Sequence, residues 1–157
     1  MHALADHDFT RGLTEAQIEK LEVLATEVRF REDELILVEG QRSQLFYFIL
    51  TGSAAIELRT PRFTVCLQAL GPGQAFGWSA LLDHQDSLFQ VRAREPMTAQ
   101  CLHGSDLSQL CRTDPELGAE IFQRILRLVA GRVKATEEKF AEMCGVSTNS
   151  NRSTLRC

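Results

Sequence analysis

The first part of the chain has the hydrophobic spacing of an amphipathic helix. Apolar residues recur mostly three or four positions apart, at Ile18, Leu21, Val23, Leu24 and Val28. The preceding segment, Thr14-Glu15-Ala16-Gln17, is a capping box in which the Gln17 side chain reaches back to the cap backbone. We therefore expect a helix from about Glu15 to Glu27.

Between Val28 and Leu102 the apolar residues occur instead in short runs that end at turn residues. The runs are Leu35–Val38, Leu45–Leu50, the alternating Ala54, Ile56 and Leu58, then Val65 with Leu67, Gln90–Ala93 and Thr98–Leu102. Short strands separated by Gly or Pro turns at near-regular spacing are typical of an antiparallel roll or sandwich. The pattern predicts a mostly β domain, an antiparallel β-roll or jelly roll with flanking helices.

Helical spacing returns after residue 104. Ser105 is placed to cap a short helix from Asp106 to Cys111, and Pro115 is suited to the first turn of a longer helix because its missing N–H has no partner there. The apolar stripe of the long helix comprises Leu117, Ile121, Ile125, Leu128, Val129, Val133, Phe140 and Met143. Cys144 and Gly145 end it. We expect one domain over residues 1–145, with this helix at about 115–144, and a disordered polar tail at 146–157.

Two further residues widen the apolar face of the long helix. Phe122 and Leu126 lie outside its main stripe, so the face is broader than packing on one sheet requires. This width predicts a homodimer that pairs through the helix at 115–143. The alternative is a helix packed only on its own roll.

Three segments, taken in order, carry a family resemblance. Val38-Glu39-Gly40 with Leu45 to Ser53 resembles the "EG…LYxIxxG" signature of the cyclic-nucleotide-binding domain superfamily. Leu70 to Gly77 is similar to its "L-x-x-G-x-x-F-G" turn, and Asp106 to Leu117 to its lead-in to the dimer helix. The resemblance implies a catabolite-activator-like sensor domain: a β-roll, a phosphate-binding cassette, and a long helix that dimerises.

The cassette departs from the family pattern at both charged positions. In the family, a glutamate follows the F-G pair and binds the ribose hydroxyl, and an arginine neutralises the cyclic phosphate. Here Trp78 follows Phe76-Gly77, and Ser87 falls near the arginine position, counted back from Val91-Arg92-Ala93. The sequence has no arginine between Gly77 and Gln90. We therefore expect a degenerate cassette in which cyclic AMP or cyclic GMP binds weakly or not at all.

A ligand site at the cassette remains one of two interpretations. The candidate ligand-binding residues are Phe76, Gly77, Trp78, Ser79, Ala80, Leu81, Ser87, Leu88, Phe89 and Arg92. Serines and aromatic rings favour a flat molecule with little charge, and Arg92 is the nearest substitute cation, unless it lies on a solvated face or in an internal salt bridge. In the other interpretation Trp78, Leu81 and Leu82 fill a collapsed pocket, and the protein is an interaction module.

The remaining chemistry argues against catalysis. The four histidines form no HxH or HExxH motif, and His84 beside Asp83 and Asp86 is a slight hint of a cupin-type metalloenzyme, the third hypothesis. We expect no catalytic residue, no metal and no cofactor beyond a small effector. The five cysteines form no CxxC pair, which indicates reduced thiols, with a redox role of Cys144 and Cys157 left open.

Charge and composition define the expected setting. The formal net charge of −4 does not suit a DNA-binding face, so we expect no nucleic-acid partner. We find no secretion signal and no run of roughly 18 apolar residues, so we expect a cytoplasmic protein without a membrane partner. Only a dozen polar residues follow Gly145, which predicts a stand-alone module that acts through a separate output protein.

Overall fold

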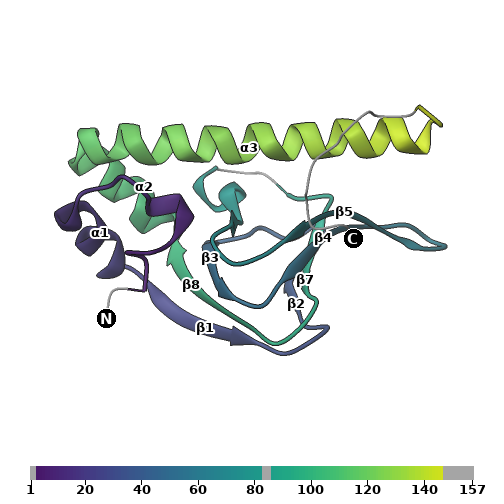
Figure 1. The fold of residues 1–157 in the computed structure, drawn as a ribbon, viewed down its shortest axis with the longest axis horizontal. Helices are drawn as coiled ribbons and strands as arrows, with labels where there is room; N and C mark the ends of the chain where they lie inside the picture. The colour runs from purple at the N-terminus through teal and green to yellow at the C-terminus, as the bar shows by residue number, and fades with distance from the viewer. Residues whose placement is uncertain (1–2, 83–85, 147–157) are drawn as a thin grey trace.

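Two four-stranded antiparallel sheets face each other in the structure, a computed structural model that describes residues 3–82 and 86–146 (Figure 1). One sheet has the order β1 (Thr26–Phe30), β8 (Met97–His103), β3 (Leu45–Thr51), β6 (Ala75–Phe76). The other has the order β2 (Leu35–Leu37), β7 (Gln90–Ala93), β4 (Ala54–Arg59), β5 (Thr64–Leu70). The β-roll expected from the sequence is confirmed.

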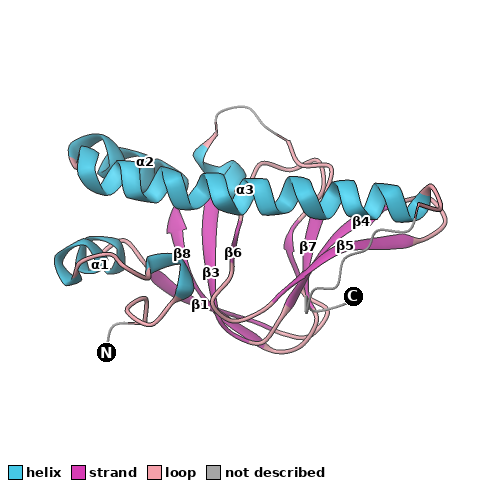
Figure 2. Cartoon of the chain, turned by 45° about the horizontal axis from the view of Figure 1, so that its top comes forward, coloured by secondary structure: helices cyan, strands magenta, loops and turns pink. Residues whose placement is uncertain are grey.

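Helices cover one side of this roll. They are η1 (Asp8–Thr10), α1 (Glu15–Glu22), η2 (Trp78–Leu81), α2 (Gly104–Thr113) and α3 (Pro115–Met143). Figures 1 and 2 show α3 as a straight helix that crosses the whole roll, with α1 and α2 gathered near its beginning. Asp114 caps α3 by accepting from the Leu117 N–H at 3.0 Å. The helix begins at Pro115 and ends at Met143, with Cys144 as its C-cap, close to the range that the spacing predicts.

Strand β3 separates two hydrophobic clusters. Phe46 and Phe48 point to the helices and join a helix cluster that includes Leu107, Leu117 and Ile121. The alternate residues Tyr47 and Ile49 point into the roll and join the inner cluster, which also contains Ile56, Phe76 and Val91. Because successive side chains of a strand point to opposite faces, a strand buried on both faces is apolar throughout. The unbroken apolar run Leu45–Leu50 therefore places β3 between the helix layer and the roll interior.

The first helix is shorter than its spacing predicts. It ends at Glu22, and the next residue, Val23, is 84% exposed. Val28 belongs to β1, which pairs with β8 from Thr26↔Cys101 to Phe30↔Met97. The prediction up to Glu27 was wrong because these ladder pairs outweigh a weak helical period. Strands β1 and β6 were also not predicted.

The second helix begins earlier than predicted. Its N-cap is His103, and Ser105 lies inside the helix. Gly104 can start the helix here because it has no side chain to strike the neighbouring backbone of Ala80. Ser105 therefore does not cap the helix, because the helix starts at Gly104, which packs closely on Ala80.

Two remaining expectations concern the cysteines and the membrane. Cys66 in β5 is disulfide-bonded, which differs from the expectation of reduced thiols, whereas Cys101, Cys111 and Cys144 are free. Cys157 and all of the predicted tail except Val146 lie outside the described residues. Within residues 3–82 and 86–146, none of the helices has the length and apolar character to cross a bilayer.

Candidate functional site

The cassette begins at Gly77, a position where the backbone allows no other residue. Gly77 has a φ of 86°, in the left-handed region, and a Cβ there would lie 2.6 Å from the carbonyl oxygen of Leu45. The close approach to β3 directs the flanking residues Phe76 and Trp78 to different hydrophobic clusters. The F-G pair of the sequence signature is therefore a backbone requirement.

Phe76 forms part of the roll interior. Its ring is fully buried and stacks on Tyr47, with ring centroids 4.8 Å apart and an interplanar angle of 11°. Burial also raises the pKa of Tyr47 to about 12, so its hydroxyl stays protonated at neutral pH. This stack holds the start of the cassette against β3.

The short helix η2 packs outward, against the helix layer. Trp78 and Leu81 are partly buried against the cluster that contains Leu107 and Leu117. Ala80 lies under the first residue of α2, Gly104, where any Cβ would overlap the Ala80 backbone. Trp78, placed where the family has its glutamate, is therefore occupied in packing.

The loop that returns from the cassette lies next to the "EG" turn. The Ser87 carbonyl accepts from the Gly40 N–H at 2.8 Å, and its hydroxyl accepts from the Phe89 N–H at 3.1 Å. Phe89 packs against the inner cluster of the roll, while Leu88 is 76% exposed. Ser87 thus lies at the edge of the roll, with Phe89 filling space beside it.

Arg92 is already paired. Its Nε lies 3.3 Å from Oε2 of Glu57, and its Nη1 donates to the Asp33 carbonyl at 2.8 Å. Gln90, 2% exposed, donates to the same Glu57 oxygen at 2.7 Å. Val91, the neighbour of Arg92, points into the inner cluster, so the Arg92 side chain lies on the opposite face of β7. Arg92, the cation that the sequence offers as a substitute, is therefore paired with Glu57 and lies on the face of β7 that points away from the inner cluster.

Metal ligands do not gather in the part of the chain that the structure describes. No group of three or more His, Cys, Asp or Glu residues there is arranged to hold an ion. Asp83 and His84, the slight hint of a metal site, lie outside the described residues.

Comparison with known families decides the assignment. The sequence profile described as "Cyclic nucleotide-binding domain" matches residues 27–114, more than half of the chain. The chain belongs to the cyclic nucleotide-binding domain family. The profile ends at Asp114, the N-cap of α3, so the match covers the roll, the cassette and α2.

Two curated proteins are similar to this cyclic nucleotide-binding domain over part of their length. A cyclic nucleotide-gated potassium channel of Mesorhizobium japonicum is 31% identical over 85 residues, which is 54% of this chain and 22% of the channel. Glutaminase 2 of Bradyrhizobium diazoefficiens is 26% identical over 116 residues, 74% of this chain and 18% of that protein. The chain thus spans about a fifth of the length of these relatives.

Solved structures show the same fold. A cyclic nucleotide-binding domain from Methylobacillus flagellatus has a TM-score of 0.76 at 19% identity, with 89% of this chain and 78% of that one covered. The Catabolite Activator Protein of Thermus thermophilus has a TM-score of 0.71 at 20% identity, covering 87% and 63%. The global regulator CLP of Xanthomonas campestris, described as c-di-GMP responsive, has a TM-score of 0.75 at 18% identity, covering 85% and 66%. The resemblance inferred from three short motifs is confirmed.

Sequence reasoning missed the contacts that connect the cassette to the long helix. Gly104 meets Ala80 of η2, and Gly118 of α3 meets the backbone of Cys111 in α2. For Gly118, which lies inside the predicted long helix, the signal was available, because glycine is unfavourable there unless close packing requires it. Gly104 precedes the predicted short helix, so no such signal was available for it. The two contacts link η2 to α2 and α2 to α3.

Proposed function

We propose that this domain is a regulatory module that binds a small effector at the cassette and signals through α3. The effector is a molecule other than cyclic AMP or cyclic GMP, or these bind only weakly. The observation that supports this proposal is the pair Trp78 and Ser87 at the two charged positions of the family pattern, with Arg92 held by Glu57. The family assignment and the regulatory neighbours support the sensor role.

The two missing charged groups determine how much weaker cyclic-nucleotide binding becomes. A hydrogen bond to a charged group contributes about 1.5–3 kcal/mol, and about 1.4 kcal/mol corresponds to a tenfold change in affinity. Losing both family contacts therefore weakens cyclic-nucleotide binding by about two to four orders of magnitude. Asp86, the acidic residue just before Ser87, adds repulsion toward an anion.

A route for the signal follows from the two glycine contacts. Movement of η2 in response to a ligand displaces Ala80, which cannot approach Gly104 any closer, so α2 moves with it. The contact between Cys111 and Gly118 then transmits the displacement to α3. Such a ligand must bind one arrangement of α3 more tightly than the other, because binding that does not discriminate shifts nothing.

The output of this movement is carried by a homodimer. Side chains on one face of α3 follow a heptad pattern, with Leu126, Val133 and Phe140 at one core position and Phe122, Val129, Thr136 and Met143 at the other. Several of the largest are exposed, including Leu126 at 68% and Phe140 at 69%. Apolar side chains with this spacing are suited to pair with a second copy of α3, and the dimer then presents its surface to a separate output protein.

Calorimetry of the protein with cyclic AMP and cyclic GMP tests the proposal. We expect dissociation constants well above the micromolar range for both, and micromolar binding would contradict it. A thermal-shift screen over uncharged and weakly charged aromatic molecules then identifies the effector class, since an occupied cassette raises the melting temperature.

A protein-interaction module with a non-functional pocket is the second candidate. The packing of Trp78 and Leu81 on the helix cluster, and of Phe89 on the inner cluster, favours it. The two candidates differ in the thermal-shift screen: a module with a filled pocket shows no stabilisation by any small molecule. If a partner protein binds the variant Trp78→Ala as well as it binds the unmodified protein, the second candidate is favoured.

A further inference from the structure

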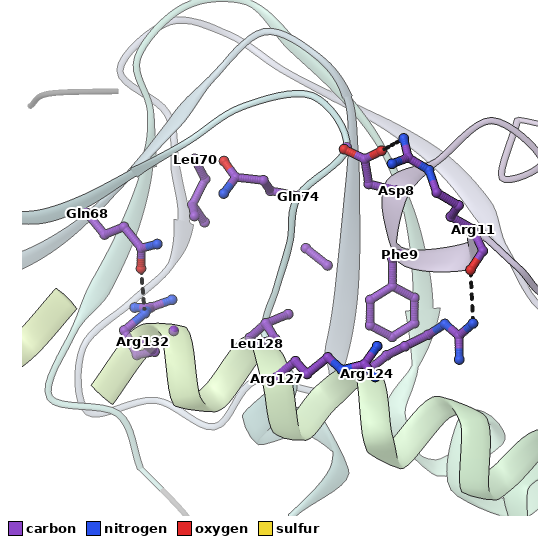
Figure 3. A pocket seen from close by; sticks show the side chains of 13 residues that line it. Asp8, Phe9, Arg11, Gln68, Leu70, Gln74, Arg124, Arg127, Leu128 and Arg132 are labelled. Carbon is purple, nitrogen blue, oxygen red and sulfur yellow. Dashed lines mark hydrogen bonds and ion pairs between the residues drawn. The ribbon is translucent and has the colours of Figure 1, made fainter. Parts of the chain in front are cut away.

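A cavity of about 490 Å³ lies between α3 and the roll, outside the cassette. Its walls come from α3, from η1 near the N-terminus, from β5 and from the turn into β6 (Figure 3). Ala75 is the lining residue next to the cassette in the sequence, and none of the candidate cassette residues lines the cavity. The volume lies in the range of small-molecule sites, which is about 300–1,000 Å³.

One face of α3 supplies most of the charge of this cavity. Arg124, Arg127 and Arg132 line it together with Leu128 and Gly131. These positions follow the i, i+3, i+4, i+7, i+8 spacing of a single helix face. The heptad residues proposed for dimerisation lie on the other side of α3, so pairing of two chains leaves this cavity open.

Two of the positive charges have no acidic partner in the described part of the chain. Arg11 pairs with Asp8, and Arg124 pairs with Glu120. Within residues 3–82 and 86–146, no carboxylate lies within 4 Å of the guanidinium of Arg127 or Arg132. The cavity wall therefore carries two uncompensated positive charges.

Arg132 is the more unusual of the two. Its Nε donates to Oε1 of Gln68 at 3.1 Å, and Figure 3 shows its guanidinium beneath that amide. Burial lowers the pKa of Arg132 to about 10, so the group remains charged at neutral pH while partly removed from water. Removing a charge from water is unfavourable unless an opposite charge lies beside it. The neutral amide of Gln68 accepts a hydrogen bond but does not supply that charge.

Gly131 keeps the space open. A Cβ at this position would meet no atom within 4 Å, so no packing contact requires glycine here. Glycine inside a helix is unfavourable relative to alanine. Its presence beside two arginines that have no acidic partner in the described residues leaves room for a ligand at this wall.

We propose that this cavity binds a phosphorylated small molecule with at least two negative charges, its phosphate groups held by Arg127 and Arg132. Guanidinium groups match phosphate oxygens in geometry and charge, and Gln68 and Gln74 add amide donors on the facing wall. Leu70, Leu128 and Phe9 provide apolar surface for the rest of the ligand. Because the site contacts α3 directly, its occupancy is a second input to the long helix, independent of the cassette.

Calorimetry with pyrophosphate and with ADP, at matched ionic strength, tests the site on the full chain. We expect the unmodified protein to bind at least one probe, and Arg127→Gln and Arg132→Gln each to weaken that binding at least tenfold. Gly131→Leu should prevent probe binding, because the leucine side chain occupies the cavity, while its higher helix propensity keeps α3 intact. Tighter binding of ADP than of pyrophosphate assigns the apolar wall to a nucleoside, and equal binding assigns the site to phosphate alone; both support the proposal.

The matched control is Arg59→Gln, which removes an exposed arginine paired with Glu39, outside the cavity. It should bind the probes as the unmodified protein does. No binding of either probe, or binding that Arg127→Gln and Arg132→Gln leave intact, overturns the proposal. Neither result bears on the cassette, whose test uses cyclic nucleotides and the positions of Trp78 and Ser87.

Discussion

Gly104, the first residue of α2, packs directly on the backbone of Ala80 in η2, leaving no room for a side chain. The contact joins the cassette to the helices through close packing of the two backbones. It makes the spacing between η2 and α2 sensitive to a single methyl group.

We therefore predict that Gly104→Ala destabilises the domain. Overpacking a tight contact costs about 1–3 kcal/mol, because the backbones of η2 and α2 must separate. Urea unfolding followed by circular dichroism measures this change. Gly131→Ala is the matched control, since its Cβ meets open space, and it should stabilise the protein by about 0.5–1 kcal/mol. Equal effects of the two substitutions would contradict the role of the Gly104 contact.

The buried His7 predicts a dependence of stability on pH. Its Nδ1 accepts from the Phe9 N–H at 3.1 Å, which leaves the proton on Nε2, 3.2 Å from the Ile49 carbonyl. Desolvation by burial lowers the pKa of His7 below its ordinary value of 6.5, so the folded state favours the neutral ring. The unfolded state then binds the proton more readily, and the free energy of unfolding falls as the pH drops below about 6.5.

Urea unfolding between pH 7.5 and pH 5 checks this dependence. In His7→Gln, the part of the fall in unfolding free energy that protonation of His7 causes should disappear. The variant should also be less stable than the unmodified protein at all pH values. His103→Gln is the control because His103 is exposed, and its profile should match that of the unmodified protein. An unchanged slope in His7→Gln would show that other groups cause the loss.

The heptad face of α3 predicts the effect of a charge on association. Phe140→Glu places a carboxylate in the proposed dimer seam, where it would be buried without a partner. We expect sedimentation velocity to show a monomer for this variant and a dimer for the unmodified protein. Gln123→Glu changes charge on a different exposed face of the same helix and should leave the dimer intact. A monomeric unmodified protein would contradict the pairing.

Restoring the family charges should restore the family ligand. In the double substitution Trp78→Glu with Ser87→Arg, cyclic AMP gains two charge-assisted contacts, and we expect its affinity to rise by about two orders of magnitude or more. Calorimetry measures the gain. The control replaces Ser87→Arg by Leu88→Arg, which adds the same charge at an exposed neighbour. A similar gain in the control would mean that charge alone, and not its position, limits binding.

The sequence by itself determined the family, the roll and most of its strands, and the course of α3. These features depend on local chemistry: Gly77 is required by a backbone turn, Pro115 favours a first helical turn, and the apolar run Leu45–Leu50 marks a strand buried on both faces. It also predicted that the family's two charged groups are missing, because identity at a motif position can be read directly from the sequence.

Only the tertiary structure decided which side chains meet. The helical period continues weakly to Val28, but pairing with β8 makes residues 26–30 a strand. The ion pair between Arg92 and Glu57, the contact of Gly104 with Ala80, and the hydrogen bond between Arg132 and Gln68 all join positions at least 24 residues apart. Contacts of this kind depend on how the sheets and helices pack together, and no periodicity along the chain encodes them.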